Sequence, residues 1–397
     1  MAPLSLVPQS KLWDLNIAGS SIHTFSHYNG LAMKTVSDAI SKRAFYHLLA
    51  FQVNGKVIDS NLFSSLSDKD WRGVIAFAHK HGLAGICLDS FERLPEDCRP
   101  PKELLLNLIG ITTQLEHLYN LHLRVIRSLS DFYNKHGIKP VLMKGFGLSL
   151  NYPRPNHRPS GDIDLFLSDG ERGDELIKGL GIEVKQNEEK HSTFVYHGIH
   201  VENHATVICE LEHDSLSDME KFLEQELTEH STYDDTSGCY LPSNMFNVVF
   251  LPLHLGGHFV FGGANLRQIL DYGMMLKNSA EDSIDWNKVR EFAVKGGFFR
   301  FFCCLNGICI DYLGFPSDCF PDWSRDAELE KKVLEDIIDA EYVNASSLAK
   351  KIRRYFANRW KYNLVYGKDS HFLGLFKRMR SWLIWRWGIG RKNVWKK

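Results

Sequence analysis

Apolar residues recur at three- and four-residue spacing in the first third of the chain, which is the pattern of helices that pack on a core. The spacing is clearest in residues 44–51, 71–78 and 104–134. Ser67 and the acidic residues after it form a typical helix start before the second of these segments. We therefore predict helices from about residue 37 to 135, with apolar stripes that serve packing.

The pattern changes near residue 137 to short apolar and alternating runs, which favour strands. We predict, in order, a strand at 138–143, a strand at 162–167, a helix at 171–180, a strand at 181–184, and a hairpin of 192–196 with 199–211 that turns at His197 and Gly198. Helical spacing returns after residue 241. The fold class predicted is α+β, with a mixed sheet flanked by helical regions.

Four regions follow from these patterns. Residues 1–32 lack periodicity and predict a flexible extension, and Met33 is a second possible start. Residues 33–136 form a helical region, residues 137–240 the mixed α/β core, and residues 241–397 a second helical region with a basic, aromatic tail.

Two aspartates lie on the strand expected at 162–167. Alternation puts Asp162 and Asp164 on one face and apolar residues on the other. Like charges roughly 7 Å apart along a strand repel each other, so a divalent cation between them explains the pair. Oxygen ligands favour Mg²⁺ or Mn²⁺. Gly161, just before them, keeps side-chain bulk away from the place where a phosphate would approach.

Lys144 and Gly145 follow the strand expected at 138–143 and begin a glycine-containing turn into a helix. A strand, a glycine turn and a helix start together offer backbone N–H groups that suit a triphosphate. The alternative is a tight turn with a solvated lysine, next to a strand that merely ends in acids.

A family resemblance rests on these residues together. Lys144-Gly145, Arg158, the run from Gly161 to Leu165, and the Glu-x-His of Glu202 and His204 resemble uncharacterised bacterial nucleotidyltransferases of the DNA polymerase beta superfamily. The resemblance implies that residues 137–240 are the catalytic core. Two departures stand out: the superfamily more often has Gly-Ser at Lys144-Gly145, and the family often has an aromatic residue at Ala205.

The resemblance also implies a reaction. Asp162 and Asp164 would hold two metal ions, and Glu202 would complete one site and draw the proton from the acceptor hydroxyl. A nucleoside monophosphate would pass from an NTP, such as ATP, to that hydroxyl. Glu210 and Glu212 are nearby competitors for the role of Glu202.

Further polar residues are candidates for the nucleotide or acceptor pocket. Alternation puts His204 on the face of Glu202, where it either contacts a phosphate, orients Glu202, or is a plain sheet histidine. In the second helical region, His254, His258, Arg267 and Asp271 fall where the resembling family tends to have polar residues. A buried hydrogen-bonded network explains them equally well, and a zinc site at His254 and His258 has no obvious third ligand.

Composition and charge limit the classes of binding partner. The 397 residues carry a formal net charge of −1, so no overall basic field points to nucleic acid. Residues 376–387 mix aromatic and cationic side chains, which either pack on the protein, bind single-stranded nucleic acid, or rest on an anionic membrane. The acceptor stays open among small molecules, sugars, proteins and RNA.

The eight cysteines show no Cys-x-x-Cys and no regular spacing, which favours reduced thiols in the cytoplasm. Those at 303, 304 and 309 predict a buried helix. No signal peptide is evident, and no apolar run reaches the length of about 18–20 residues that spans a membrane.

Three functions of different classes remain. We favour a metal-dependent nucleotidyltransferase. The alternatives are a nucleotide-binding regulator with little turnover and an RNA-binding module that uses the basic tail.

Overall fold

The computed structural model describes residues 39–55, 58–187, 191–208, 214–261, 263–280, 283–340 and 357–367. The predicted extension at 1–32, the second possible start, both competing glutamates and the basic tail at 376–387 lie outside these residues.

Helices precede and follow a group of strands. The helices are α2 Ala39–Asn54, α3 Ser60–Ser64, α4 Asp68–Lys80, α5 Ala84–Glu92, α6 Lys102–Lys135, α7 Gly145–Ser149, α8 Gly170–Gly179, α9 Asp214–Glu229, α10 Asn244–Phe261, α11 Leu266–Lys277, α12 Trp286–Lys295, α13 Phe299–Asp311, α14 Ala327–Asp339 and α16 Arg359–Tyr366. Short 3₁₀ turns are η3 Glu96–Cys98, η4 Pro155–His157 and η5 Ser317–Cys319. The strands are β1 Pro140–Met143, β2 Ile163–Leu167, β3 Lys185–Asn187, β4 His191–Tyr196, β5 Ile199–His204, β6 Thr232–Tyr233 and β7 Tyr240–Leu241.

These strands form one mixed sheet in the order β3-β4-β5-β2-β1-β7-β6. The central strand β2 is antiparallel to β1 and parallel to β5. The hairpin of β4 and β5 turns at His197 and Gly198, both with positive φ, as predicted. The α+β class with a mixed sheet is confirmed.

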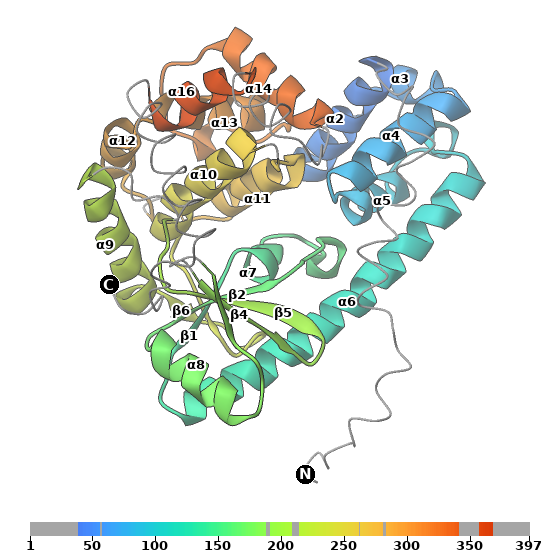
Figure 1. The fold of residues 1–397 in the computed structure, drawn as a ribbon. Coiled ribbons are helices and arrows are strands. Elements are labelled where there is room, and N and C mark those ends of the chain that lie inside the picture. Colours follow the sequence, from blue (N-terminus) through green and yellow to red (C-terminus); the bar gives the residue numbers. More distant parts are fainter. Residues whose placement is uncertain are drawn as a thin grey trace.

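The two faces of the sheet meet different layers. Ile163, Leu165 and Leu167 of β2 pack in one core with apolar residues of α6 and α8, whereas Phe166 packs against the larger core of the other helices. In Figure 1, α6 and α8 lie below the sheet, and α10 and α11 lie above it. The predicted alternation along β2 is confirmed, and its polar positions face the upper helices.

The N-terminal and C-terminal helices share the larger core, which runs from α2 through α13 and α14 to α16. The predicted helix start at Ser67 is confirmed, because Ser67 caps α4 in a capping box with Asp70, and α6 spans the predicted long helix. Leu118, a member of the predicted apolar stripe of α6, is exposed. Cys303, Cys304 and Cys309 are buried on α13, and every cysteine in the described residues is a free thiol. Within the described part of the chain, we find no helix whose length and apolar character would let it cross a membrane.

Two strand predictions are wrong. The strand expected at 181–184 lies instead at β3, residues 185–187. Gly181 adopts a φ of +78° just after α8, which turns the chain there. Ile182 and Val184 pack with their side chains against the core that β2 shares with α6 and α8, but their backbones are not paired in the sheet. Strand β5 ends at His204 and does not continue to residue 211. The buried Glu220 carboxylate accepts hydrogen bonds from the backbone N–H groups of Val207 and Ile208, both at 2.7 Å, so these groups have no strand partner.

Candidate active site

Strand register brings the central charged residues together. Met143, the last residue of β1, pairs with Asp164 of β2, and Asp164 pairs in turn with Glu202 of β5. Lys144 follows directly after Met143. His204 lies two residues beyond Glu202, on the same face of β5, because side chains alternate. Residues from three strands therefore converge on one spot of the upper face.

Asp164 is the centre of this group. Its Oδ1 lies 2.9 Å from Lys144 Nζ and 3.0 Å from His204 Nε2. The same His204 nitrogen lies 3.6 Å from Glu202 Oε2. Asp164, Glu202 and His204 each offer one ligand atom, and these atoms all lie within 4.8 Å of one another. Two carboxylates and an imidazole at this spacing match the ligands of a divalent cation.

Local charge keeps both carboxylates of this cluster ionised. Burial alone would raise the pKa of Asp164, but the Lys144 ammonium and the hydrogen bond from His204 outweigh it, so this pKa lies well below its usual range. The interaction with the nearby His204 is also the main cause that lowers the pKa of Glu202. Burial lowers the pKa of His204, but its interactions with Asp164 and Glu202 prevail and raise it.

Asp162 lies at the border of the cluster. It precedes β2, its side chain is exposed, and it is not one of the three groups whose ligand atoms converge. Partial burial, followed by repulsion from Glu202 and Asp164, raises the pKa of Asp162. A cation bound beside Asp162 would offset the repulsion from the neighbouring carboxylates and so lower this pKa.

The two glycines of the motifs border the same space. Gly145 has a φ of +33°, and a Cβ added there would lie 3.9 Å from Asp164 Oδ2. A Cβ added at Gly161 would meet nothing within 4 Å, so the approach to Asp162 is open on that side. Backbone thus comes close to the cluster without side-chain bulk.

His254 and His258 stand together on α10, as their spacing of four residues predicts. Their Nε2 atoms lie 3.1 Å apart, so one ring donates a hydrogen bond to the other. Burial, followed by the nearby Lys144 ammonium, lowers the pKa of both, which keeps both rings neutral. No third His, Cys, Asp or Glu of the described residues joins them in a cluster with metal-ligand spacing.

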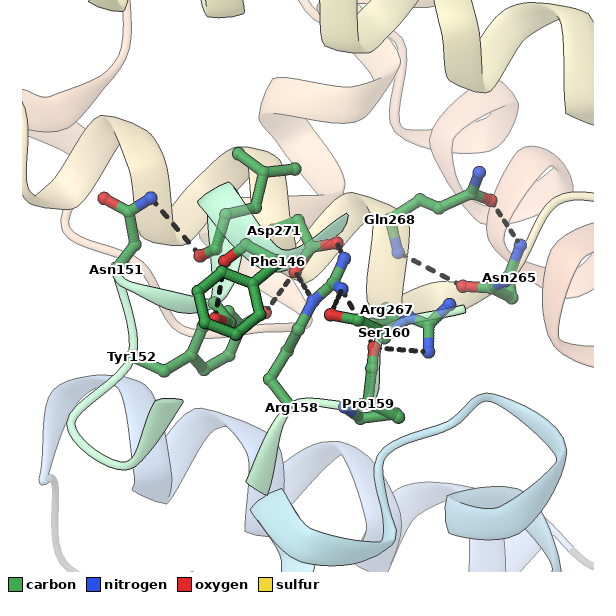
Figure 2. A network of polar contacts seen from close by, with 12 residues as sticks. Phe146, Asn151, Tyr152, Arg158, Pro159, Ser160, Asn265, Arg267, Gln268 and Asp271 are labelled. Atoms are coloured by element: carbon green, nitrogen blue, oxygen red, sulfur yellow. Dashed lines mark hydrogen bonds and ion pairs between the residues drawn. The ribbon is translucent and has the colours of Figure 1, made fainter. Parts of the chain in front are cut away.

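Arg158 and Asp271 form a second, buried group (Figure 2). Arg158 Nε and Nη2 donate to the two oxygens of Asp271 at 3.1 and 2.5 Å, and Tyr152 donates to Asp271 at 2.8 Å. Arg158 also bonds the Pro159 carbonyl and the Ser160 hydroxyl. Its guanidinium is thus occupied by protein groups, and this pair braces the backbone that leads into β2.

Arg267 of α11 braces the same backbone. Its Nη1 donates to the Pro159 carbonyl at 3.1 Å, as Figure 2 shows. The structure therefore divides the predicted residues into a cluster around Asp164, a histidine pair, and a buried support for the loop before β2.

A family model described as uncharacterised nucleotidyltransferase matches residues 67–314, which is more than half of the chain. The chain belongs to this family. The resemblance read from the sequence is thus confirmed, and the protein is an enzyme that transfers nucleotidyl groups. No curated protein and no solved structure matched the chain.

The sequence analysis missed several residues near the acidic cluster of this nucleotidyltransferase. His191 of β4 lies opposite His204 in the hairpin, with its Nε2 3.7 Å from Glu202 Oε1. Counting back from the predicted turn at His197 and Gly198 gives this pairing, so the signal was present in the sequence.

Two other histidines hold the loop of the nucleotidyltransferase that leads into β2. His122 of α6 is buried, and its Nε2 donates to the Gly161 carbonyl at 2.6 Å. His157 lies between two carboxylates, 2.8 Å from Asp89 Oδ1 and 3.1 Å from Glu116 Oε1. No local pattern identifies these partners, because they come from helices far away in the sequence.

Proposed function

We propose that this nucleotidyltransferase moves a nucleoside monophosphate from an NTP to a hydroxyl group of an acceptor, with release of pyrophosphate and with Mg²⁺ or Mn²⁺ as the required ion. The observation that carries the proposal is the convergence of Asp164, Glu202 and His204, whose ligand atoms lie within 4.8 Å of one another beside Lys144.

The residues fit a divalent cation. Two ionised carboxylates supply hard oxygen ligands, and the raised pKa of Asp162, caused by partial burial and by its acidic neighbours, indicates that further positive charge is favourable there. Asp164 and Glu202 would hold the ion, with His204 as a neutral ligand and Asp162 at the open side. When bound, such an ion stabilises the negative charge that develops on the oxygens of the reacting phosphate.

The chain's own groups would then perform the transfer. The acceptor oxygen forms a bond to the α-phosphorus, and the bond from that phosphorus to the bridging oxygen of pyrophosphate breaks, so pyrophosphate leaves with the electron pair. Glu202, which is less buried than Asp164, would take the proton of the acceptor hydroxyl. Lys144 would bind the phosphates, and Gly145 and Gly161 leave space for them.

The remaining candidates take supporting roles in this proposal. Arg158, Arg267 and Asp271 act by bracing the loop before β2, since Arg158 pairs with Asp271 and both arginines donate to the Pro159 carbonyl. Burial lowers the pKa of His254 and His258, and both are near enough to Lys144 for its charge to lower this pKa further, so they would act as neutral hydrogen-bonding groups for the nucleotide or the acceptor.

Calorimetric titration of each NTP in the presence of Mg²⁺ tests the proposal directly. We expect at least one NTP to bind the wild type, and we expect this metal-dependent binding to be lost in Asp162→Ala/Asp164→Ala and in Glu202→Gln. With the preferred NTP, pyrophosphate release is then measured across a panel of hydroxyl acceptors.

Glu183→Gln is the matched control, because Glu183 is exposed and pairs only loosely with Lys185 at 3.6 Å. This variant should bind NTPs as the wild type does. The proposal is wrong if no NTP binds the wild type, or if binding survives unchanged without the three acidic residues. Tight binding with no pyrophosphate release from any acceptor would instead select the regulator with little turnover.

A further inference from the structure

The backbone of Lys144 adopts a conformation that is unfavourable for every residue except glycine. Its φ of 48° and ψ of −150° lie in a region that glycine populates readily and that other residues enter only at an energetic cost. Glycine at this position would remove the strain. The strain is therefore explained only if the lysine side chain does something that offsets it.

That side chain reaches the central carboxylate of the cluster. Lys144 Nζ and His204 Nε2 both contact the same oxygen, Asp164 Oδ1, at 2.9 and 3.0 Å. Both side chains of the Lys144 and Asp164 pair are largely buried, with 14% and 11% of their surfaces exposed. A carboxylate oxygen has about two lone-pair sites. With two donors present, a cation binds this oxygen only after one of them has left.

We propose that Lys144 is an exchangeable counter-ion for Asp164: its ammonium holds this carboxylate while the site is empty and moves to the phosphates of the nucleotide, which opens Asp164 to the metal. This inference rests on the proposed function, because it assumes that metal and triphosphate share the site. It adds that the protein alone binds metal weakly and that nucleotide and metal bind cooperatively.

The geometry provides for such an exchange. Lysine carries a compact charge on a flexible four-carbon stem, so the ammonium swings over several ångströms while the backbone stays in place. The strained turn points the stem at the cluster, and Gly145 next to it leaves room beside Asp164. Thermodynamic linkage then requires that the nucleotide raise metal affinity by the same factor by which the metal raises nucleotide affinity.

Binding of Mn²⁺ alone, measured by calorimetry without nucleotide, is the first test. Lys144→Met keeps the length of the stem and removes the charge. We expect this variant to bind Mn²⁺ more tightly than the wild type, roughly 5- to 150-fold, which is the usual range of coupling between two ligands. Lys139→Met is the matched control. Lys139 precedes β1, whereas Lys144 follows this strand, and the Lys139 ammonium donates to the Thr228 carbonyl and not to Asp164. Its Mn²⁺ affinity should equal that of the wild type.

The second test uses inorganic tripolyphosphate with a chelator present, so that neither a base nor a metal contributes. Lys144→Met should bind it more weakly than the wild type. Equal Mn²⁺ affinity of the wild type and Lys144→Met overturns the counter-ion role. Tighter Mn²⁺ binding with unchanged tripolyphosphate affinity overturns the exchange, since the ammonium would then not move to phosphate.

Two further variants separate this inference from the proposed function and from misfolding. Asp164→Ala should abolish the Mn²⁺ binding that Lys144→Met gains. If no variant binds Mn²⁺ through Asp164, the metal site of the proposed function fails, and the inference fails with it. Lys144→Gly relieves the backbone strain and lacks the ammonium, so it should match Lys144→Met in Mn²⁺ affinity even where the methionine variant folds poorly.

Discussion

Removal of the Asp271 carboxylate should be one of the most destabilising single substitutions in the loop support. Asp271→Ala leaves Arg158, which is 5% exposed, as a buried cation without its counter-charge. Asp271 accepts two hydrogen bonds from Arg158 and one from Tyr152. Loss of one partner of a buried ion pair costs about 3–5 kcal/mol, because the remaining charge is not solvated.

Urea unfolding followed by far-ultraviolet circular dichroism measures this cost as a change in the free energy of unfolding. Asp322→Ala removes an exposed carboxylate and should change that free energy by no more than about 0.5 kcal/mol. Arg158→Met and the double variant Arg158→Met/Asp271→Ala complete a double-mutant cycle.

The cycle distinguishes an ion pair from two unrelated losses. If the pair is coupled, the double variant loses less than the sum of the single variants, by about 0.5–3 kcal/mol, since the second substitution removes a charge that the first left unpaired. A cost below about 1 kcal/mol for Asp271→Ala, or strict additivity, would refute this reasoning about the buried pair.

The remaining predictions concern packing and pH. Gly307→Ala should destabilise the protein by about 1–3 kcal/mol, because the added Cβ would lie 2.2 Å from Glu330 Cδ. Gly110→Ala, in the open part of α6, should stabilise the protein by about 0.5–1 kcal/mol. Thermal unfolding of both variants measures these changes. The pKa of His157 is raised above 6.5, because hydrogen bonds to two carboxylates outweigh burial. The stabilisation that depends on its proton is full below that pH and is lost as pH rises through the folded pKa, so the stability difference between wild type and His157→Gln should shrink at alkaline pH.

Much of the cluster around Asp164 followed from the sequence, because it depends on local periodicity. Alternation puts Asp164 on the polar face of β2, and Glu202 and His204 on one face of β5, and these faces coincide in the registers that put the apolar residues of both strands together on the other face. The lysine turn was recognised as well, but its backbone strain and its contact with Asp164 were not. Both depend on the antiparallel pairing of β1 and β2, which no local pattern fixes.

The buried support of the loop was beyond sequence reasoning for a different reason. Arg158 and Asp271 are 113 residues apart, and a single sequence holds no signal that an arginine and a distant aspartate meet. The sequence therefore allowed two interpretations of the polar residues on the predicted helices, pocket lining and a buried hydrogen-bonded network, and Asp271 lies in such a network. The strand expected at 181–184 failed because its apolar residues are buried by side-chain packing alone, and periodicity does not distinguish that from backbone pairing.

The loop that leads into β2 connects the cluster around Asp164 to helices that precede and follow the strands in the sequence. Its buried His157 and Arg158 bond carboxylates of α5 and α11, and the carbonyl of Gly161 accepts from α6. A fragment of residues 137–240 contains all of the clustered acids but none of these partners. It would lose the counter-charges of His157 and Arg158 together with the helices that bury these two side chains, so the contacts that hold the loop before β2 would be gone. The match to the family over residues 67–314 spans the helices that supply these partners. The unit that holds the acidic residues in place is therefore the sheet together with its flanking helices.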